Sequence, residues 1–364
     1  MPTEPIVRPT LPPDPRILVA RLDSLGDCIL SSSFFAGLRQ LFPTAHLTGA
    51  FSEDVVPLFD HCPIFDRVVA MPLEPSDGRL GLLDPPYDLA ICPRWDVDHW
   101  STRQLALESR APIRVGFDRG PYRHDEPRDG WVGAYFSHPV RTRSDYHEVA
   151  KGGDLLHFLG ASTPAPDPRL WLSAAEEGEA EAFIRGHRLE RFAVLAVAAR
   201  WSHRVWPVEN FLTVIDDLVT RESALRFVVV GGEDALAPGA WLHQMRPETV
   251  VHAAGSLPLL ASAALIARSV LYIGMDSGPK HMAAAAGVPV VEISCHPRSG
   301  SIDHPNSPSR FGAYATRNRV LRPARARAPC VDGCMIMGEA HCIVQVPAAD
   351  VVAAALSLLE RPGL

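Results

Sequence analysis

Short apolar runs alternate with amphipathic segments along most of the chain. The first run, Arg16–Arg21 (RILVAR), is apolar and partly β-branched, which is typical of a buried strand. A polar turn, Leu22–Asp27, follows it, and from about Cys28 to Leu41 apolar residues recur at helical spacing. The same alternation continues through His46–Ala50, Asp54–Phe59, Arg67–Ala70 and Tyr87–Cys92, and a helix is expected at about His147–Leu159. Strands that alternate with helices imply parallel pairing through right-handed crossovers.

A proline-rich segment, Thr163–Arg169, separates this part of the chain from a second series of strands and helices. Strands of the second series are expected at Phe192–Val197, Arg226–Val230, Val250–Ala253, Val270–Ile273 and Val288–Ile293. Helices are expected at Ala174–Gly186, Val208–Arg221, Pro258–Ala267, Pro279–Ala286 and Ala348–Leu359. Two further segments, Arg119–Val140 and Cys295–Pro347, are predicted to be loops.

The pattern therefore predicts an α/β protein of two similar, doubly wound domains that face a cleft. The first domain would span residues 16–165 and the second residues 170–345, after a disordered leader at 1–15 and before a terminal helix within 346–364. A length of 364 residues agrees with two domains. Because open sheets bind ligands beyond the carboxyl ends of their strands, the turns that follow strands are the places to look for chemistry.

Composition narrows the class of protein. Apolar residues make up 47% of the chain and charged residues 21%, which is typical of globular proteins. The net charge of −7 argues against an extended basic face for nucleic acid. No apolar stretch approaches the roughly 20 residues of a membrane span, and no apolar signal segment precedes Ile17. Seven scattered cysteines do not suggest a secreted disulfide scaffold, so we expect a cytoplasmic protein.

The turn Asp276–His281 (DSGPKH) lies between an expected strand and an expected helix. Free backbone N–H groups and the positive end of the helix dipole suit a phosphate or pyrophosphate at such a turn. Lys280 and His281 add positive charge, and Lys280 is one of only two lysines among 35 basic residues, the other being Lys151. The alternative is an ordinary capped helix with Asp276 or Ser277 at the cap, and both interpretations can hold together.

Polar residues follow three other expected strands. Asp27, after the first strand, is either a general base that takes a proton from a hydroxyl or an acidic residue that favours the first turn of a helix. Arg204, in Arg200–Pro207 (RWSHRVWP), could pair with phosphate, and Glu233 could accept hydrogen bonds from a ribose. The alternative for both is an exposed loop with solvated charges.

Several motifs of other enzyme classes are missing. The chain has no G-x-G-x-x-G, no G-x-x-x-x-G-K-[ST] and no H-E-x-x-H. Asp96-Val97-Asp98 spells D-x-D, but this short pattern is common by chance and we predict no metal there. Cys330, Cys334 and Cys342, with Cys295, His296 and His341 as further candidates, are either a thiolate site for zinc or iron or packed thiols. The C-x₃-C-x₇-C spacing is not that of a standard finger and favours packed thiols.

Five segments between about residues 16 and 295 together resemble glycosyltransferase family 9, the heptosyltransferase-type enzymes. They are RILVARLDSLGDCILSSSFFAGLRQLFP, YHEVAKGGDLLHFLG, RVWPVENF, VVVGGEDA and YIGMDSGPKHMAAAAGVPVV, in this order. The resemblance implies a GT-B fold, which has two Rossmann-like domains facing a cleft and a last helix that crosses back to the first domain. The sequence departs from the family at Ala198–Ser202, which replaces the threonines that commonly precede the [KR]-x-W-P segment, and in the cysteine-rich tail.

The resemblance also implies an inverting, metal-independent transfer of a sugar from an ADP-activated heptose to a hydroxyl, without a cofactor. Asp27 would be the general base. Residues implied to bind the nucleotide sugar are Ser202, Arg204, Glu233, Asp276, Ser277, Gly278, Lys280 and His281. Weaker candidates for the acceptor are Arg94, Asp98, His147 and Lys151.

The acceptor class stays open at this point: a glycan, a lipid-linked glycan, a protein or a small molecule. We expect no nucleic-acid partner and at most peripheral contact with a membrane, at its inner face. The alternatives are a transferase or epimerase of the same fold that uses a UDP- or GDP-sugar, and a non-catalytic subunit that binds a nucleotide sugar.

Overall fold

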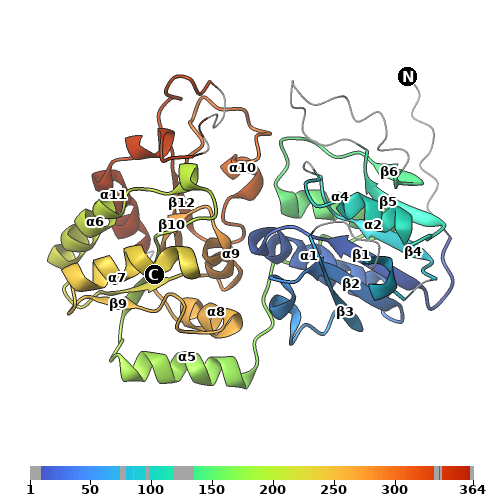
Figure 1. Cartoon of the computed structure of the whole chain (residues 1–364), viewed down its shortest axis with the longest axis horizontal. Helices are drawn as coiled ribbons and strands as arrows, with labels where there is room; N and C mark the ends of the chain where they lie inside the picture. Colours follow the sequence, from blue (N-terminus) through green and yellow to red (C-terminus); the bar gives the residue numbers. More distant parts are fainter. Residues whose placement is uncertain are drawn as a thin grey trace. The chain divides into compact units, whose positions relative to one another are not determined.

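The structure is a computed structural model of the whole chain, and it describes residues 10–73, 79–84, 86–95, 98–118, 135–331, 336 and 338–360. The chain divides into two compact units, Met1–Trp171 and Leu172–Leu364 (Figure 1). The boundary lies two residues beyond the proline-rich segment Thr163–Arg169. None of the helices in the described part of the chain is long and apolar enough to cross a membrane.

The first unit is built on a parallel sheet of six strands in the order β3-β2-β1-β4-β5-β6. The strands are β1 (Arg16–Arg21), β2 (His46–Ser52), β3 (Arg67–Met71), β4 (Leu89–Cys92), β5 (Ile113–Phe117) and β6 (His138–Val140). The helices are α1 (Leu25–Leu41), α2 (Thr102–Glu108) and α4 (Glu148–Leu159), with short 3₁₀ turns at Val56–Phe59 and Arg79–Leu82. Helices α1 and α4 pack together, whereas α2 packs on β1 and β4.

The second unit repeats the plan with a parallel sheet in the order β12-β11-β10-β7-β8-β9. Its strands are β7 (Phe192–Ala196), β8 (Arg226–Val230), β9 (Val250–His252), β10 (Leu271–Met275), β11 (Val290–Ile293) and β12 (Asn318–Leu321). Its helices are α5 (Ala174–Gly186), α6 (Val208–Arg221), α7 (Leu236–Met245), α8 (Leu259–Ala267), α9 (Gly278–Ala285), α10 (Pro308–Phe311) and α11 (Ala348–Leu359). Short 3₁₀ turns are η3 (Ser202–Arg204), η4 (Glu233–Ala235) and η5 (Cys342–Gln345).

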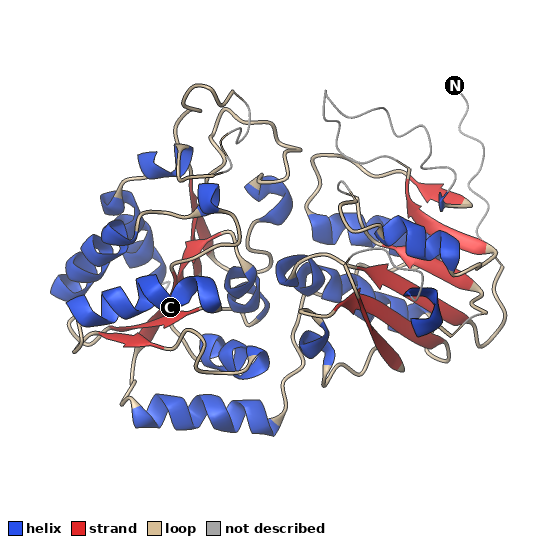
Figure 2. Ribbon diagram, viewed as in Figure 1, coloured by secondary structure: helices blue, strands red, loops and turns tan. Residues whose placement is uncertain are grey.

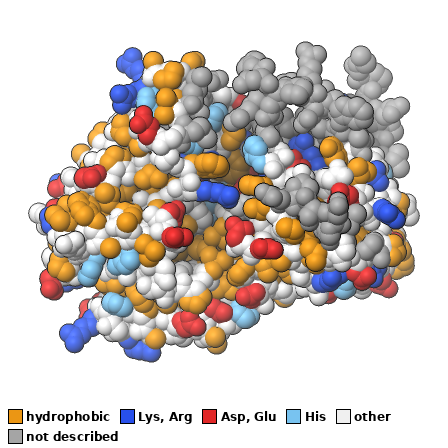
Figure 3. All heavy atoms as spheres, in the orientation of Figure 1, with side chains coloured by type: hydrophobic (Ala, Val, Ile, Leu, Met, Phe, Trp, Pro, Cys, Tyr) orange, Lys and Arg blue, Asp and Glu red, His pale blue; other side chains and the backbone are white. Residues whose placement is uncertain are grey.

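Helices flank the sheet in each unit (Figure 2), and apolar side chains of the strands are buried. In the second unit, alternate residues of β7, β8, β10 and β11 form one core with α6, α7 and α11. Helix α8 packs against α5 and α9. Charged side chains of both signs lie among apolar ones on the face drawn in Figure 3.

The last helix corrects one expectation. We expected it to cross back to the first domain, but α11 belongs to the second unit and packs on α6, β10, β11 and β12. Val351, Val352, Ala355 and Leu358 of α11 are buried in the core of that unit. The apolar stripe of the helix is therefore buried by the sheet of its own unit.

Six of the described helices and strands were not predicted from the sequence, namely α2, β5, β6, α7, α10 and β12, and three of them (β6, α10 and β12) fall in segments expected to be loops. Strand β6 lies in Arg119–Val140 and β12 lies in Cys295–Pro347, while residues 119–134 of the first segment are outside the described residues. Helix α2 and strand β5 also follow β4 without having been predicted. Apart from α7, these elements are only three to seven residues long, so their periodicity is too short to recognise.

Candidate active site

The turn after β10 lies at the switch point of the second sheet. Strand β10 and strand β7 are neighbours, and the chain runs from β7 to β8 on one side and from β10 to β11 on the other. Loops at such a point diverge and leave a crevice at the carboxyl ends of the strands. Met275 ends β10, Ser277 takes the N-cap position of α9, and Gly278 begins the helix. The Ser277 side chain makes no capping bond; its Oγ lies 3.5 Å from the Met275 carbonyl oxygen.

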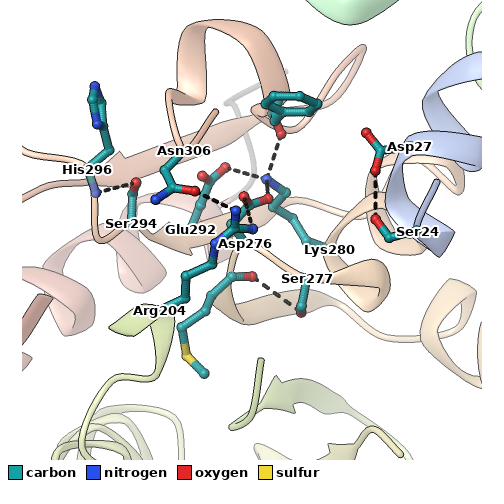
Figure 4. Close-up of polar contacts among 12 residues, drawn as sticks. Ser24, Asp27, Arg204, Asp276, Ser277, Lys280, Glu292, Ser294, His296 and Asn306 are labelled. Atoms are coloured by element: carbon teal, nitrogen blue, oxygen red, sulfur yellow. Dashed lines mark hydrogen bonds and ion pairs between the residues drawn. The ribbon is translucent and has the colours of Figure 1, made fainter. Parts of the chain in front are cut away.

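Asp276 is the centre of a charged cluster (Figure 4). Its Oδ1 lies 2.6 Å from Lys280 Nζ and 3.7 Å from His281 Nε2, and its Oδ2 lies 3.2 Å from an Arg204 guanidinium nitrogen. Burial alone would raise the pKa of Asp276, but Lys280, His281 and Arg204 outweigh it and hold the pKa well below its usual range. Asp276 is therefore a carboxylate at neutral pH and can only accept hydrogen bonds.

The ammonium of Lys280, which was predicted to bind the diphosphate, bonds three groups of the protein itself. The side chain is 0% exposed, and Nζ contacts Asp276 Oδ1 at 2.6 Å, Glu292 Oε2 at 3.1 Å and the Phe311 carbonyl oxygen at 2.6 Å. A lysine ammonium has three N–H donors, and these three acceptors take all of them. Burial lowers the pKa of Lys280, but the two carboxylates raise it by more, so the group stays charged.

Glu292 and Asn306 were missed by the sequence analysis. Glu292 lies in β11 opposite Gly274 of β10, is 1% exposed, and has its pKa raised by burial and by the charge of Asp276 in spite of Lys280. Asn306 Oδ1 accepts from Arg204, and its amide nitrogen lies 3.4 Å from His203 Nε2. Glu292 could have been found from the sequence, because a glutamate inside the apolar strand VVEI is unusual. Asn306 lies in a loop whose sequence has no comparable signal.

The other residues implied to bind the donor lie on loops at the same edge of the sheet. Ser202 and Arg204 form η3, which follows β7, and Glu233 begins η4, which follows β8. Ser202 and Glu233 are exposed, whereas Arg204 is partly buried by its bonds to Asp276 and Asn306. The structure thus brings Arg204, Asp276, Lys280 and His281 together, while the donor contacts of Ser202 and Glu233 remain predictions.

The first unit carries a second charged cluster at its own switch point, between β1 and β4. Arg21 Nε lies 3.0 Å from the buried Asp23, which also pairs with Arg94 from the loop after β4. Arg21 lies 3.5 Å from Asp27 Oδ1, and Ser24 Oγ donates to Asp27 Oδ2 at 2.6 Å (Figure 4). Asp27 is in the first turn of α1, which begins at Leu25, three residues before the predicted start. Its side chain is 22% exposed, so the carboxylate is held in place but open to solvent.

All four acceptor candidates have partners within the protein, and their contacts with an acceptor remain predictions. Both carboxylate oxygens of Asp98 accept backbone N–H groups of α2, and His147 Nδ1 caps α4. Lys151 is 1% exposed, bonds Glu148 at 2.8 Å and the Tyr146 carbonyl oxygen at 2.7 Å, and lies over the Trp95 ring. Arg94 is also buried, against Asp23. The other two residues of the D-x-D pattern, Asp96 and Val97, are outside the described residues.

The cysteine candidates separate into two places. Cys330, His341 and Cys342 form a group whose ligand atoms all lie within 4.8 Å of one another. His296 is elsewhere: it stacks on His304, and burial, with that neighbour and Arg322, lowers its pKa to about 4. Cys295 is buried beside β11, and Cys334 is outside the described residues.

Comparisons with known proteins show the family and the fold of the chain. A model of glycosyltransferase family 9 (heptosyltransferase) matches residues 94–341, more than half of the chain. Lipopolysaccharide heptosyltransferase 3 of Escherichia coli is 24% identical over 364 residues, covering 92% of this chain and 96% of the relative. The glycosyl transferase family 9 structure from Veillonella parvula DSM 2008 has a TM-score of 0.78 at 21% identity, covering 97% of this chain and 99% of that chain. The ADP-heptose lps heptosyltransferase II of E. coli has a TM-score of 0.68 at 17% identity, covering 94% and 98%.

Proposed function

The chain belongs to glycosyltransferase family 9 and has a GT-B fold, and from this we propose that it moves a heptose from an ADP-activated donor to a hydroxyl of a glycan acceptor. We propose further that the transfer inverts the anomeric carbon and needs neither a metal ion nor a cofactor. The observation that carries the proposal is the charged cluster at the switch point of the second sheet, where Arg204 and the first turn of α9 offer donors to a diphosphate.

The chemistry needs one base and one site for the leaving group. Asp27 takes the proton of the acceptor hydroxyl while the hydroxyl oxygen forms its bond to the anomeric carbon. The bond between that carbon and the diphosphate oxygen breaks, and the electron pair leaves with ADP. Ser24 fixes one oxygen of the Asp27 carboxylate. Arg204 and the backbone N–H of Gly278 at the start of α9 stabilise the charge that develops on the diphosphate.

The donor and acceptor classes are supported by the relatives. One solved relative is described as an ADP-heptose heptosyltransferase, and the curated relative as a lipopolysaccharide heptosyltransferase. We therefore propose a sugar hydroxyl of a lipid-linked glycan as acceptor. Such an acceptor would be reached at the inner face of a membrane by peripheral contact.

A donor screen coupled to Asp27→Asn tests the proposal. Purified protein is given ADP-heptose, UDP-sugars or GDP-sugars with a lipopolysaccharide core acceptor, and released nucleoside diphosphate is measured with and without EDTA. We expect ADP release that EDTA does not change, and a loss of about 10²–10⁴-fold in Asp27→Asn with ADP affinity retained. The exposed Asp60→Asn is the matched control and should keep full activity.

Two results would contradict the proposal. Full turnover by Asp27→Asn would remove Asp27 as the base. Activity that appears only with a UDP- or GDP-sugar would replace the ADP donor. Activity that is lost to EDTA and returns with Mg²⁺, which a thiolate site disfavours, would replace the metal-free step.

A further inference from the structure

Two thiols and one imidazole meet in the C-terminal part of the second unit. His341 Nδ1 lies 3.5 Å from Cys330 Sγ and 3.4 Å from Cys342 Sγ. Both cysteines are buried, His341 is partly buried, and neither sulfur is in a disulfide. We propose that Cys330, His341 and Cys342 bind a divalent transition metal ion of the Zn²⁺ or Fe²⁺ class, through both sulfurs and Nδ1.

The distances between these atoms are those of ligands around one ion. Zinc binds sulfur at about 2.3 Å and imidazole nitrogen at about 2.0–2.1 Å in tetrahedral sites, which puts sulfur and nitrogen about 3.6 Å apart. The two observed separations of 3.5 and 3.4 Å match that edge of the tetrahedron. All three ligand atoms lie within 4.8 Å of one another, as the ligands of a single ion do, and this geometry favours a metal site over the packed thiols expected from the spacing.

The chemistry of the three ligands selects the class of metal. Thiolates with an imidazole favour zinc or iron and disfavour magnesium or calcium, which prefer oxygen ligands. Each cysteine loses its thiol proton on binding, and the two thiolates balance the charge of a divalent ion without any change of oxidation state. The Arg327 backbone N–H donates to Cys342 Sγ at 3.5 Å, an arrangement that stabilises a thiolate.

The site would be structural rather than catalytic. Cys342 begins η5, whose Ile343 lies in the core of the second unit, and the Val346 carbonyl oxygen accepts the Trp206 indole N–H at 3.1 Å. The ion would link the chain at Cys330 to η5. Because η5 contacts η3, it would also stabilise the position of the turn that contains Arg204. This role is separate from the proposed metal-free transfer step, which does not use the ion.

Metal analysis of the full chain tests the site. The protein is purified through a tag without histidines and without chelator, and its zinc and iron are measured by mass spectrometry. We expect about one equivalent of metal in the wild type and a loss of most of it in Cys330→Ser and in Cys342→Ser. Cys62→Ser, at a buried cysteine of the first unit, is the matched control and should retain the metal.

Cobalt substitution covers the case in which a variant fails to fold. The wild type is stripped with a chelator and titrated with Co²⁺, and the absorption spectrum is recorded before and after adding Zn²⁺. We expect the sulfur-to-cobalt charge-transfer band of a thiolate site, which Zn²⁺ then removes. The proposal is overturned if neither bound metal nor this band is found, if the metal survives both cysteine substitutions, or if mass spectrometry shows a Cys330–Cys342 disulfide.

Discussion

Replacing Lys280 by Met separates the two roles that its position suggests. The ammonium is 0% exposed and contacts Asp276, Glu292 and the Phe311 carbonyl oxygen. Methionine has a similar length but no charge, so Glu292, which is 1% exposed, loses the cation that compensates it. Asp276 keeps Arg204 and His281. The substitution therefore leaves one buried carboxylate without the ammonium that it contacts and barely changes the packing.

The expected cost follows from that uncompensated charge. Removing one partner of a buried ion pair costs about 3–5 kcal/mol of unfolding free energy. The second unit has the size at which 1 kcal/mol shifts the melting temperature by about 2–4 °C, so Lys280→Met should melt about 6–20 °C below the wild type. In Lys280→Met/Glu292→Met the charge is absent as well, and most of the lost stability should return. Differential scanning calorimetry of the three proteins measures this.

The loss of stability in Lys280→Met should depend on pH. In the variant Glu292 has lost Lys280, so its pKa, already raised in the folded protein, rises further. The folded state then holds a proton that the unfolded chain has released, and stability falls as pH rises through this window. The melting difference from the wild type should thus be larger at about pH 8 than at about pH 5. Lys280→Met that melts like the wild type but binds ADP weakly would refute the reasoning and restore Lys280 as a diphosphate ligand.

Two further substitutions examine the site and the sheet beneath it. Arg204→Met should weaken ADP binding by about 10–100-fold in calorimetry, because a charged hydrogen bond contributes about 1.5–3 kcal/mol, while the exposed Arg200→Met on the same loop binds normally. Gly274→Ala should lower the unfolding free energy by about 1–3 kcal/mol in chemical denaturation, since its Cβ would lie 2.7 Å from both the Ala196 carbonyl oxygen and the Tyr272 hydroxyl. Gly178→Ala on α5 meets nothing within 4 Å and should be neutral or stabilising; equal losses in both variants would contradict the packing argument.

The fold could be predicted from the sequence because its longer elements are uninterrupted. Strands β1 and β8 and helices α6 and α11 have the predicted bounds, since apolar runs and helical periodicity are clear over these lengths. Helix α7 was missed because Pro238 and Gly239 read as helix breakers, although proline is tolerated near the start of a helix. The apolar stripe of α11 predicts that the helix is buried, but it does not specify which domain the helix packs against.

Site residues were harder to predict because local sequence places a side chain on an element without saying what it contacts. Asp98 and His147 were acceptor candidates from the family resemblance, and the structure shows that each accepts hydrogen bonding from backbone N–H at the start of a helix. The buried pairing of Asp23 with Arg94 joins two strands that are neighbours in the sheet and about 70 residues apart in the chain. Such a contact follows only once the strand order is known.

The two lysines of the chain have similar surroundings. Lys280 and Lys151 are both buried, and each bonds a carboxylate that lies three or four residues earlier in the chain. Each ammonium also donates to a backbone carbonyl oxygen, of Phe311 or of Tyr146. A compact ammonium with three donors fits such a pocket, whereas the planar fork of arginine needs more room and a different set of acceptors. A rare lysine in an arginine-rich chain therefore indicates a shaped buried pocket at least as well as a phosphate site, and the glutamate inside β11 is what distinguishes the two at Lys280.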